Sequence, residues 1–193
     1  KDSVEALVPA ALEKLGQIDI LVNNAGVTRD NLTMRMKDEE WDDVIRINLE
    51  ATFRLMRAAT KPMMKARFGR IITITSVVGT TGNPGQANYA ASKGGVISFT
   101  RSIALDYAAD GIRANAVLPG SVETPMLRAA GEQFNPSDPE GAMKNWGALH
   151  PLGFLIQPRD IANVIAFLAS DEARVITGAP IIADSGLLAG LGV

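Results

Sequence analysis

Tyr89 and Lys93 stand four residues apart in the segment Tyr89-Ala90-Ala91-Ser92-Lys93. In a helix this spacing places both side chains on one face, a turn apart. A phenol with its ordinary pKa of about 10 is a poor proton carrier at neutral pH. A neighbouring ammonium favours the phenolate and lowers that pKa. The pair therefore predicts proton transfer by Tyr89, although a Tyr-x-x-x-Lys spacing alone is more often solvated helix surface.

Small or polar residues follow three of the expected strands, and they strengthen the prediction that Tyr89 and Lys93 have a catalytic role. In parallel sheets, ligands bind at the carboxyl ends of the strands, so residues at three successive strand ends would border one crevice. Glycine at such a position allows the backbone to approach a ligand closely. The residues concerned are Asn23-Asn24-Ala25-Gly26 after the segment 18–22, Ser76 after 70–75, and Pro119-Gly120 after 112–118.

Apolar periodicity and turn residues predict the elements that would position these groups. We expect helices over 4–15 (ended by Gly16), 38–65 (with Asp38 as N-cap), 88–109 (ended by Gly111) and 158–169, and strands over 18–22, 70–76, 112–118 and 179–183. Residues 79–85 read as a loop and 121–150 as mixed helix and loop. Strands alternating with helices indicate an α/β fold with a covered parallel sheet, in one domain over residues 1–193.

Composition excludes several classes of function. The 193 residues carry a formal charge of −2 and no concentrated basic run, which argues against nucleic acid as the main partner. The absence of cysteine excludes disulfides, and a single histidine makes a zinc site a poor interpretation, so no metal is expected. No apolar stretch is long enough to cross a bilayer and no signal peptide is visible, so we expect a cytoplasmic protein without a membrane partner.

With these residues in order, the chain resembles the short-chain dehydrogenase/reductase superfamily. The resemblance rests on Asn23-Asn24-Ala25-Gly26, on Ser76 and the Tyr89/Lys93 pair, on Pro119-Gly120 with Thr124, and on Asn48, which stands in mid-helix where asparagine is unfavourable unless its side chain has a role. It implies a Rossmann-like, doubly wound parallel sheet. It also implies an NAD(P)-dependent oxidoreductase that transfers hydride between nicotinamide and a carbonyl or secondary alcohol, with NADP favoured over NAD.

The resemblance also implies a role for each site residue. Tyr89 is the general acid, Lys93 lowers its pKa and holds the nicotinamide ribose, and Ser76 orients the substrate carbonyl. Asn48 holds a water molecule that links Lys93 to solvent. The remaining cofactor contacts implied are Asn23, Ala25 and Gly26 on the ribose and nicotinamide side, and Pro119, Gly120, Val122 and Thr124 at the carboxamide end.

Within the superfamily, residues 18–103 look most like the 3-oxoacyl-acyl-carrier-protein reductases. The segment 121–150 is longer than the lid of that subfamily and looks more like alcohol or sugar dehydrogenases, which are the alternative. An acyl thioester or other small carbonyl compound is the implied substrate, and acyl carrier protein an implied partner. Arg67 fits a basic carrier-docking site near the active-site mouth, but Asp110 stands where a second basic residue is expected. The resemblance further implies a homo-oligomer formed through the long helices, where we expect Ile97, Ile103 and Leu105 to be exposed.

The family's glycine-rich turn for the cofactor pyrophosphate precedes the segment that opens this chain. We therefore expect the first β-α-β-α-β portion of the fold to be missing, an exposed apolar edge on the strand 18–22, and weak cofactor binding by the chain alone. Gly186, Gly190 and Gly192 have a phosphate-loop spacing, but no helix is expected after them. A truncated, non-catalytic fragment is the alternative of another class. His150 reads as structural or solvent-facing.

Overall fold

Four parallel strands form the centre of the fold. The structure, a computed structural model, describes residues 2–190. The strands β1 (Ile20–Asn23), β2 (Gly69–Ile74), β3 (Ile112–Pro119) and β4 (Pro180–Ala183) lie side by side in the order β1-β2-β3-β4. Every neighbouring pair is parallel, with Ile20 beside Arg70, Gly69 beside Ile112, and Ala116 beside Pro180. The predicted parallel α/β sheet is confirmed.

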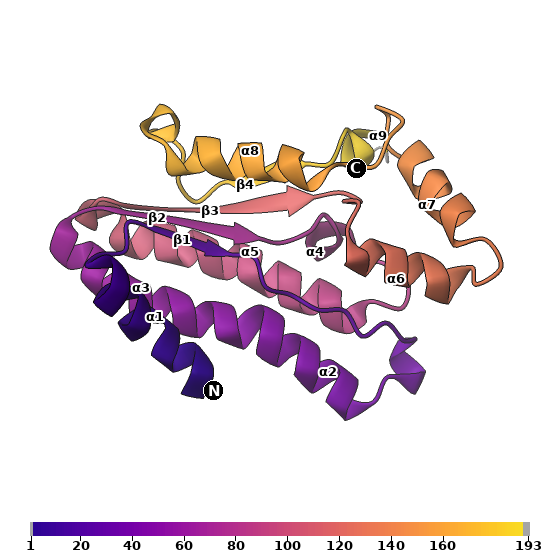
Figure 1. The fold of residues 1–193 in the computed structure, drawn as a ribbon, viewed down its shortest axis with the longest axis horizontal. Coiled ribbons are helices and arrows are strands. Elements are labelled where there is room, and N and C mark those ends of the chain that lie inside the picture. The colour runs from indigo at the N-terminus through magenta and orange to yellow at the C-terminus, as the bar shows by residue number, and fades with distance from the viewer. Residues whose placement is uncertain (1, 191–193) are drawn as a thin grey trace.

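Helices cover both faces of this sheet, as Figure 1 shows. On one face lie α1 (Asp2–Leu15), α3 (Ala51–Ala66) and α5 (Ala87–Tyr107), and on the other lies α8 (Pro158–Ala169). The first layer buries a core that includes Met56, Met63, Ile71 and Ile112, and the second a core around Ile72, Val117 and Leu168. The sheet is therefore doubly wound, as predicted. None of the described helices is long and apolar enough to cross a membrane.

The two central strands are buried on both faces, whereas β1 is not. Every residue of β3 is buried, including the polar Arg113 and Asn115, because helices cover both faces of the sheet at this strand. In β1, Ile20 and Val22 remain 48% and 41% exposed. The expectation of an exposed apolar edge on this strand is met in the part of the chain that the structure describes.

The long helix predicted over 38–65 consists of three parts. It begins as α2 (Asp38–Val44), passes through a π-helical turn at Ile45–Glu50 (η2), and continues as α3. Asp38 is the first helical residue and not the N-cap, which is Lys37; the carboxylate of Glu40 accepts a hydrogen bond from the Lys37 N–H instead. The prediction of Asp38 as N-cap is therefore wrong by one residue. A π-helical turn often marks a functional site, and this one contains Asn48.

Helix α5 buries two residues that we expected to be exposed. Ile97 and Ile103 are only 5% and 6% exposed, because both face the core beneath the sheet. Leu105, which follows on the opposite side, is 83% exposed as expected. The helix is apolar on more than one face, so its sequence pattern does not distinguish core positions from surface positions. Assembly of the protein through this helix stays a prediction.

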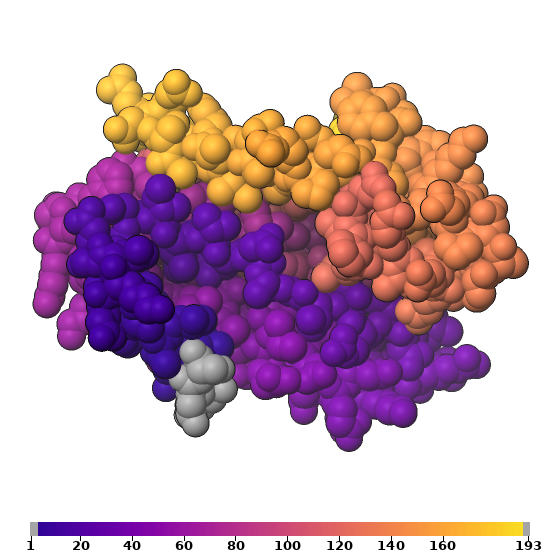
Figure 2. Space-filling model, viewed as in Figure 1, coloured from indigo at the N-terminus to yellow at the C-terminus, as the bar shows by residue number. Residues whose placement is uncertain are grey.

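The segment 121–150 folds as a helical hairpin beyond the carboxyl ends of the strands. Its helices α6 (Pro125–Phe134) and α7 (Pro139–Ala148) each begin with proline, and Thr124 and Asp138 cap them. The rings of Phe134 and Trp146 meet edge to face at 6.2 Å and hold the two helices together. Figure 2 shows this hairpin, in salmon and orange, at one end of the molecule above the violet segment that contains α2.

Gly111, between α5 and β3, is expected to tolerate no side chain. Its φ is +78°, and a Cβ there would lie 2.3 Å from the carbonyl oxygen of Arg67. We expect Gly111→Ala to lower the free energy of unfolding by about 3 kcal/mol, from backbone strain and the displaced Arg67 carbonyl. Gly16→Ala is the matched control, since Gly16 also follows a helix with a φ of +80° but nothing lies within 4 Å of the added Cβ. Urea unfolding of both variants separates the backbone strain from the clash with the Arg67 carbonyl. Equal losses of unfolding free energy in the two variants would contradict the contribution of the clash.

Candidate active site

The carboxyl end of β2 and the first turns of α5 bring Ser76, Tyr89 and Lys93 together. Ser76 and Lys93 are buried, and the hydroxyls of Ser76 and Tyr89 are hydrogen-bonded to each other. The Lys93 Nζ donates a hydrogen bond of 2.8 Å to the carbonyl oxygen of Ile74, and it lies 5.6 Å from the centroid of the Tyr89 ring. The predicted one-face arrangement of this pair is therefore present.

The pKa shifts at this site differ from those that the spacing predicts. Burial raises the pKa of Tyr89 to about 12, the hydrogen bond from Ser76 opposes that shift, and the negative charge of Asp30 adds to it. Burial also lowers the pKa of Lys93 to about 8. The expectation that Lys93 lowers the pKa of Tyr89 is not met in this structure, because burial is the largest cause of the Tyr89 shift and Lys93 is not among its causes.

Asn48 and Gly26 border the same small space as the lysine. A Cβ added to Gly26 would lie 3.4 Å from both the Asn48 Oδ1 and the Lys93 Nζ. The Asn48 side chain is fully bonded: it accepts from the Val27 N–H at 2.9 Å and donates to the Val27 carbonyl and the Ser92 hydroxyl. Asn48 therefore fixes the backbone that follows Gly26. The water relay through Asn48 stays a prediction.

Asn23 presents an unused acceptor at the end of β1. Its side chain is buried and donates to the Thr73 hydroxyl at 3.2 Å, whereas its Oδ1 has no hydrogen-bond partner within the described residues. Asn24 and Ala25, which follow in the chain, are exposed. A buried unpaired oxygen costs free energy unless a ligand or water donor reaches it.

The third strand end is held by His150, to which the sequence analysis gave no role at the site. The Gly120 N–H donates to the Ala183 carbonyl, and a Cβ on Gly120 would lie 2.7 Å from the His150 Nε2. His150 is buried; its Nε2 accepts from the Ser121 N–H at 3.1 Å, and its Nδ1 contacts the Trp146 carbonyl at 2.9 Å. His150 thus ties the two ends of the helical hairpin together, so it is structural and not solvent-facing.

The predicted carboxamide-side residues surround the start of this hairpin. Val122 forms a parallel bridge to Ile156, and the Thr124 hydroxyl donates to the Val122 carbonyl at 3.3 Å and accepts from the Leu127 N–H. The Pro119 carbonyl accepts from the Val77 N–H, which links the end of β3 to the turn after Ser76. The structure therefore connects this group to the Ser76 turn through the main chain.

Asn88, which sequence analysis overlooked, fastens the loop after β1 to α5. It is fully buried, and its Nδ2 donates to the carbonyls of Arg29 and Glu40 at 2.9 and 3.1 Å. Its Oδ1 accepts from the N–H of Tyr89 at 2.7 Å. The only available signal was its position immediately before Tyr89, which does not reveal partners 48 and 59 residues away in the chain.

We expect Asn88→Ala to destabilise the protein by about 2 kcal/mol, because two buried carbonyls lose their donor. The loop before Asn31 should also loosen, which hydrogen exchange of the amides at 27–31 would detect. Asn83→Ala, which changes the same residue type at an exposed position in the preceding turn, should leave thermal unfolding within error. Unchanged exchange in Asn88→Ala would contradict the anchoring role.

Arg67 does not lie where a carrier-docking residue was expected. It ends α3 just before β2 begins, at the opposite end of the strands from Ser76 and Tyr89 of the same chain. Its guanidinium forms an ion pair of 2.5 Å with Asp110, the position where a second basic residue was expected. The prediction of a basic residue near this chain's active-site mouth is therefore wrong for Arg67.

At the phosphate-loop glycine spacing after β4, a carboxylate of the protein itself accepts the backbone N–H groups. A single helical turn, α9 (Leu187–Gly190), does follow the strand, contrary to expectation. The buried Asp184 accepts from the N–H groups of Gly186 and Leu188 at 2.9 and 2.8 Å, where an anion would otherwise bind. Gly192 lies outside the described residues. Within residues 2–190 there is also no group of three or more acidic, histidine or cysteine side chains suited to a metal ion.

Comparison with known proteins agrees with this geometry. A family model described as "Enoyl-(Acyl carrier protein) reductase" matches residues 1–188. The 3-oxoacyl-[acyl-carrier-protein] reductase FabG of Escherichia coli (strain K12) is 52% identical over 187 residues, which cover 96% of this chain and 72% of that protein. Two solved structures superpose with a TM-score of 0.93 at 36% identity. They are levodione reductase (96% of this chain, 72% of that one) and the Thermoplasma acidophilum aldohexose dehydrogenase (97% and 74%).

These matches extend over nearly the whole chain, and they include the strand ends and the α5 pair from which the site is built. The fold agrees as well, since the doubly wound parallel sheet superposes closely on both solved structures. The chain is thus homologous to the 3-oxoacyl-[acyl-carrier-protein] reductases, and it belongs to the short-chain dehydrogenase/reductase family.

Proposed function

We propose that this protein reduces a carbonyl group to a secondary alcohol, with a 3-oxoacyl thioester as substrate and NADPH or NADH as hydride donor. The observation that carries the proposal is the cluster of Ser76, Tyr89 and Lys93 around the space beside Gly26. In reduction, negative charge develops on the carbonyl oxygen, so a hydrogen-bond donor and a proton source must both lie at that oxygen.

Ser76 and Tyr89 supply those two functions. The Ser76 hydroxyl, fixed by the turn that follows β2, orients the carbonyl oxygen and stabilises its developing charge. Because its pKa is raised to about 12, the Tyr89 phenol stays protonated at neutral pH and is ready to donate. Lys93 then supports the phenolate that this donation leaves, and Asn48 lies beside the same space next to Gly26.

The residues present fit a nicotinamide cofactor. The unpaired Asn23 Oδ1 suits a ribose hydroxyl donor, and Gly26 leaves the room that a Cβ would fill beside Lys93. Ala25, Pro119, Gly120, Val122 and Thr124 complete the proposed cofactor contacts. When bound, the cofactor would supply the hydride, and these residues would hold its ribose and nicotinamide beside Ser76 and Tyr89. NADP is favoured over NAD by family resemblance.

The relatives favour a 3-oxoacyl thioester among carbonyl compounds. The Escherichia coli relative acts, by its name, on 3-oxoacyl groups of acyl carrier protein, and half of all aligned residues are shared. Acyl carrier protein is therefore a proposed partner. The Arg67–Asp110 ion pair leaves little free positive charge at the position where carrier docking was expected, so a carrier would need another basic surface.

Oxidation of a sugar or small cyclic alcohol is the second candidate. The aldohexose dehydrogenase superposes with the same TM-score as levodione reductase, and the segment 121–150 looks more like alcohol or sugar dehydrogenases than like the lid of the 3-oxoacyl reductases. The reaction runs in the opposite direction, with Tyr89 as the proton acceptor. A substrate panel separates the two candidates.

The experiment that tests the proposal follows reduced-nicotinamide absorbance with NADPH or NADH, the purified protein, and the N-acetylcysteamine thioester of 3-oxobutanoate. We expect loss of absorbance with the thioester and little or no gain with NAD(P) and aldohexoses. Turnover of aldohexoses alone would favour the second candidate. No turnover in either direction would leave the protein without the proposed activity and favour a non-catalytic role.

A further inference from the structure

A cleft of about 300 Å³ lies between the loop after Gly26 and helix α6. One wall is made by Val27, Thr28, Arg29 and Asp30, and the other by Met126, Ala129, Ala130 and Gln133. The loop that forms the first wall lies beside the reacting groups, because Asn48 binds the backbone of Val27 and the charge of Asp30 acts on Tyr89. The part of a substrate that extends beyond its carbonyl would enter this cleft.

Asp30 presents an unused acceptor within this cleft. Its Oδ2 accepts a hydrogen bond of 2.9 Å from the Gln86 Nε2. Its Oδ1 is buried from solvent and has no hydrogen-bond partner within the described residues. Burial accordingly raises the pKa of this carboxyl group, and the bond from Gln86 opposes the shift. A buried carboxylate oxygen without a donor is costly, so its retention here points to a donor supplied from outside the chain.

The surrounding bonds hold the Asp30 side chain in place at the wall of the cleft. Gln86 is held in one orientation, since its Oε1 accepts from the Asn83 Nδ2 at 3.0 Å while its Nε2 donates to Asp30. The backbone beside Asp30 is held too, because the Asn31 N–H donates to the Gly85 carbonyl at 2.8 Å and Asn88 binds the Arg29 carbonyl. The acceptor is therefore preorganised, as binding groups are when they act without rearrangement.

We propose that Asp30 is a specificity-determining residue that accepts a hydrogen bond, through Oδ1, from an N–H donor on the thiol arm of the substrate. This inference rests on the proposed function, which makes an acyl thioester the substrate. The 3-oxoacyl thioester group has no N–H or O–H of its own, whereas a pantetheine-type arm carries secondary amides a few bonds from the sulfur. An ionised carboxylate accepts but does not donate, so it selects such an amide and repels an anionic group.

Two thioesters of 3-oxobutanoate test the proposal. One has an N-acetylcysteamine arm with a single amide N–H, and the other a plain S-pentyl arm of similar length. For the unchanged protein we expect kcat/KM to favour the amide arm by about tenfold, the usual scale for one hydrogen bond to a charged group. In Asp30→Asn, Gln86 should hold the amide oxygen and turn the new NH₂ toward the cleft, so this preference should disappear, whatever change the loss of the Asp30 charge makes in the rates with both thioesters.

Asp43→Asn is the matched control, because it removes the same charge from a carboxylate that pairs with Arg29 and Arg46 on the protein surface. It should keep the tenfold preference. A preference that survives unchanged in Asp30→Asn would overturn the proposal, as would an equal loss in Asp43→Asn.

Binding of both thioesters, measured by saturation-transfer NMR on the same three proteins, decides the matter without turnover. We expect the amide-bearing thioester to bind more tightly to the unchanged protein and to Asp43→Asn, but not to Asp30→Asn. Equal affinities in all three proteins would overturn the role of Asp30. Failure of the unchanged protein to reduce either thioester, with the binding difference present, would count against the proposed function alone.

Discussion

Replacement of Tyr89 by phenylalanine is expected to lower kcat for thioester reduction by about a thousandfold or more. The substitution removes one oxygen atom, so the α5 helix and the bonds of Asn88 and Lys93 should remain in place. It removes the proposed proton donor, and general acid catalysis contributes about 10² to 10⁴ in rate. The hydrogen bond between the Ser76 and Tyr89 hydroxyls is lost at the same time, which weakens the orientation of the carbonyl. Initial rates of nicotinamide oxidation measure the effect.

Tyr107→Phe serves as the control for this variant. Tyr107 is the only other tyrosine in the sequence and lies at the far end of α5, packed against the core beneath the sheet. Its replacement should leave kcat within about twofold. If Tyr89→Phe retained a tenth or more of the original rate, the phenol would not be the proton donor, and the assignment of the site would have to change.

Replacement of Lys93 by methionine is expected to abolish activity and yet to stabilise the fold. Lys93 is buried, and its pKa falls from 10.5 to about 8. At about 1.4 kcal/mol per pH unit, this lowering corresponds to roughly 3 kcal/mol of destabilisation at neutral pH. Lys93→Met also loses the 2.8 Å hydrogen bond to the Ile74 carbonyl, which costs about 1 kcal/mol. The net gain in unfolding free energy for Lys93→Met should therefore be about 2 kcal/mol.

The pH dependence of this gain has a definite sign. Below about pH 8 the lysine is charged in both the folded and the unfolded protein, so its desolvation penalty is fully present. Between pH 8 and 10.5 the folded protein has lost the proton that the unfolded chain still binds, so the stability of the unchanged protein rises toward that of Lys93→Met. Urea unfolding at pH 7 and pH 10 measures both values.

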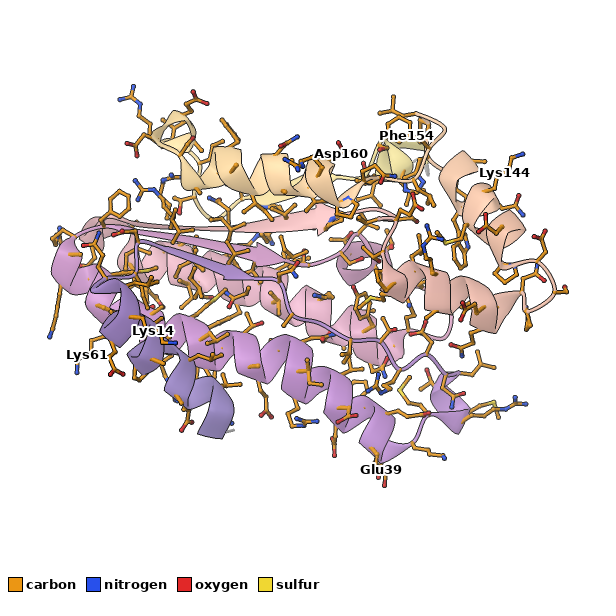
Figure 3. All side chains as sticks on the ribbon, in the orientation of Figure 1. Lys14, Glu39, Lys61, Lys144, Phe154 and Asp160 are labelled. Carbon is orange, nitrogen blue, oxygen red and sulfur yellow. The ribbon has the colours of Figure 1, made fainter. Side chains whose placement is uncertain are left out.

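Lys61→Met is the control, because Lys61 is exposed on α3, where Figure 3 shows its side chain at the periphery of the molecule. It should change neither activity nor the pH dependence of stability. A Lys93→Met protein that is less stable than the unchanged one at pH 7 would mean that the buried ammonium is a net stabilising group, contrary to its lowered pKa.

Much of the fold could be predicted from the sequence where one local signal dominates. Helix α8 has the predicted bounds, 158–169, because a proline begins it and its apolar residues form one stripe. The strands were found to within two residues, since β-branched runs between glycine and proline leave few alternatives. The helical hairpin at 121–150 was left open, because its form depends on the contact between Phe134 and Trp146, twelve residues apart.

The site residues could be identified from spacing, but their electrostatics could not. Tyr89 and Lys93 lie one turn apart as predicted, yet the depth at which α5 is buried decides their pKa shifts, and burial is a tertiary property. The same limit applies to Ile97 and Ile103, whose burial depends on which face of an apolar helix meets the sheet. Asn88 and Asp30 were overlooked because their partners come from distant segments, and no local pattern predicts them.

The central claim is that the residues around Gly26 serve hydride transfer to a carbonyl carbon, and isotope transfer tests it most directly. The protein is incubated with the 3-oxobutanoyl N-acetylcysteamine thioester and NADPH, or NADH, that carries deuterium at C4 of the nicotinamide. With the two C4 epimers of the labelled cofactor used separately, we predict that one of them gives a 3-hydroxybutanoyl product with one deuterium on C3, and that Tyr89→Phe forms this product about a thousandfold more slowly or not at all. A product without deuterium, or no product from the unchanged protein with either cofactor, would contradict the account.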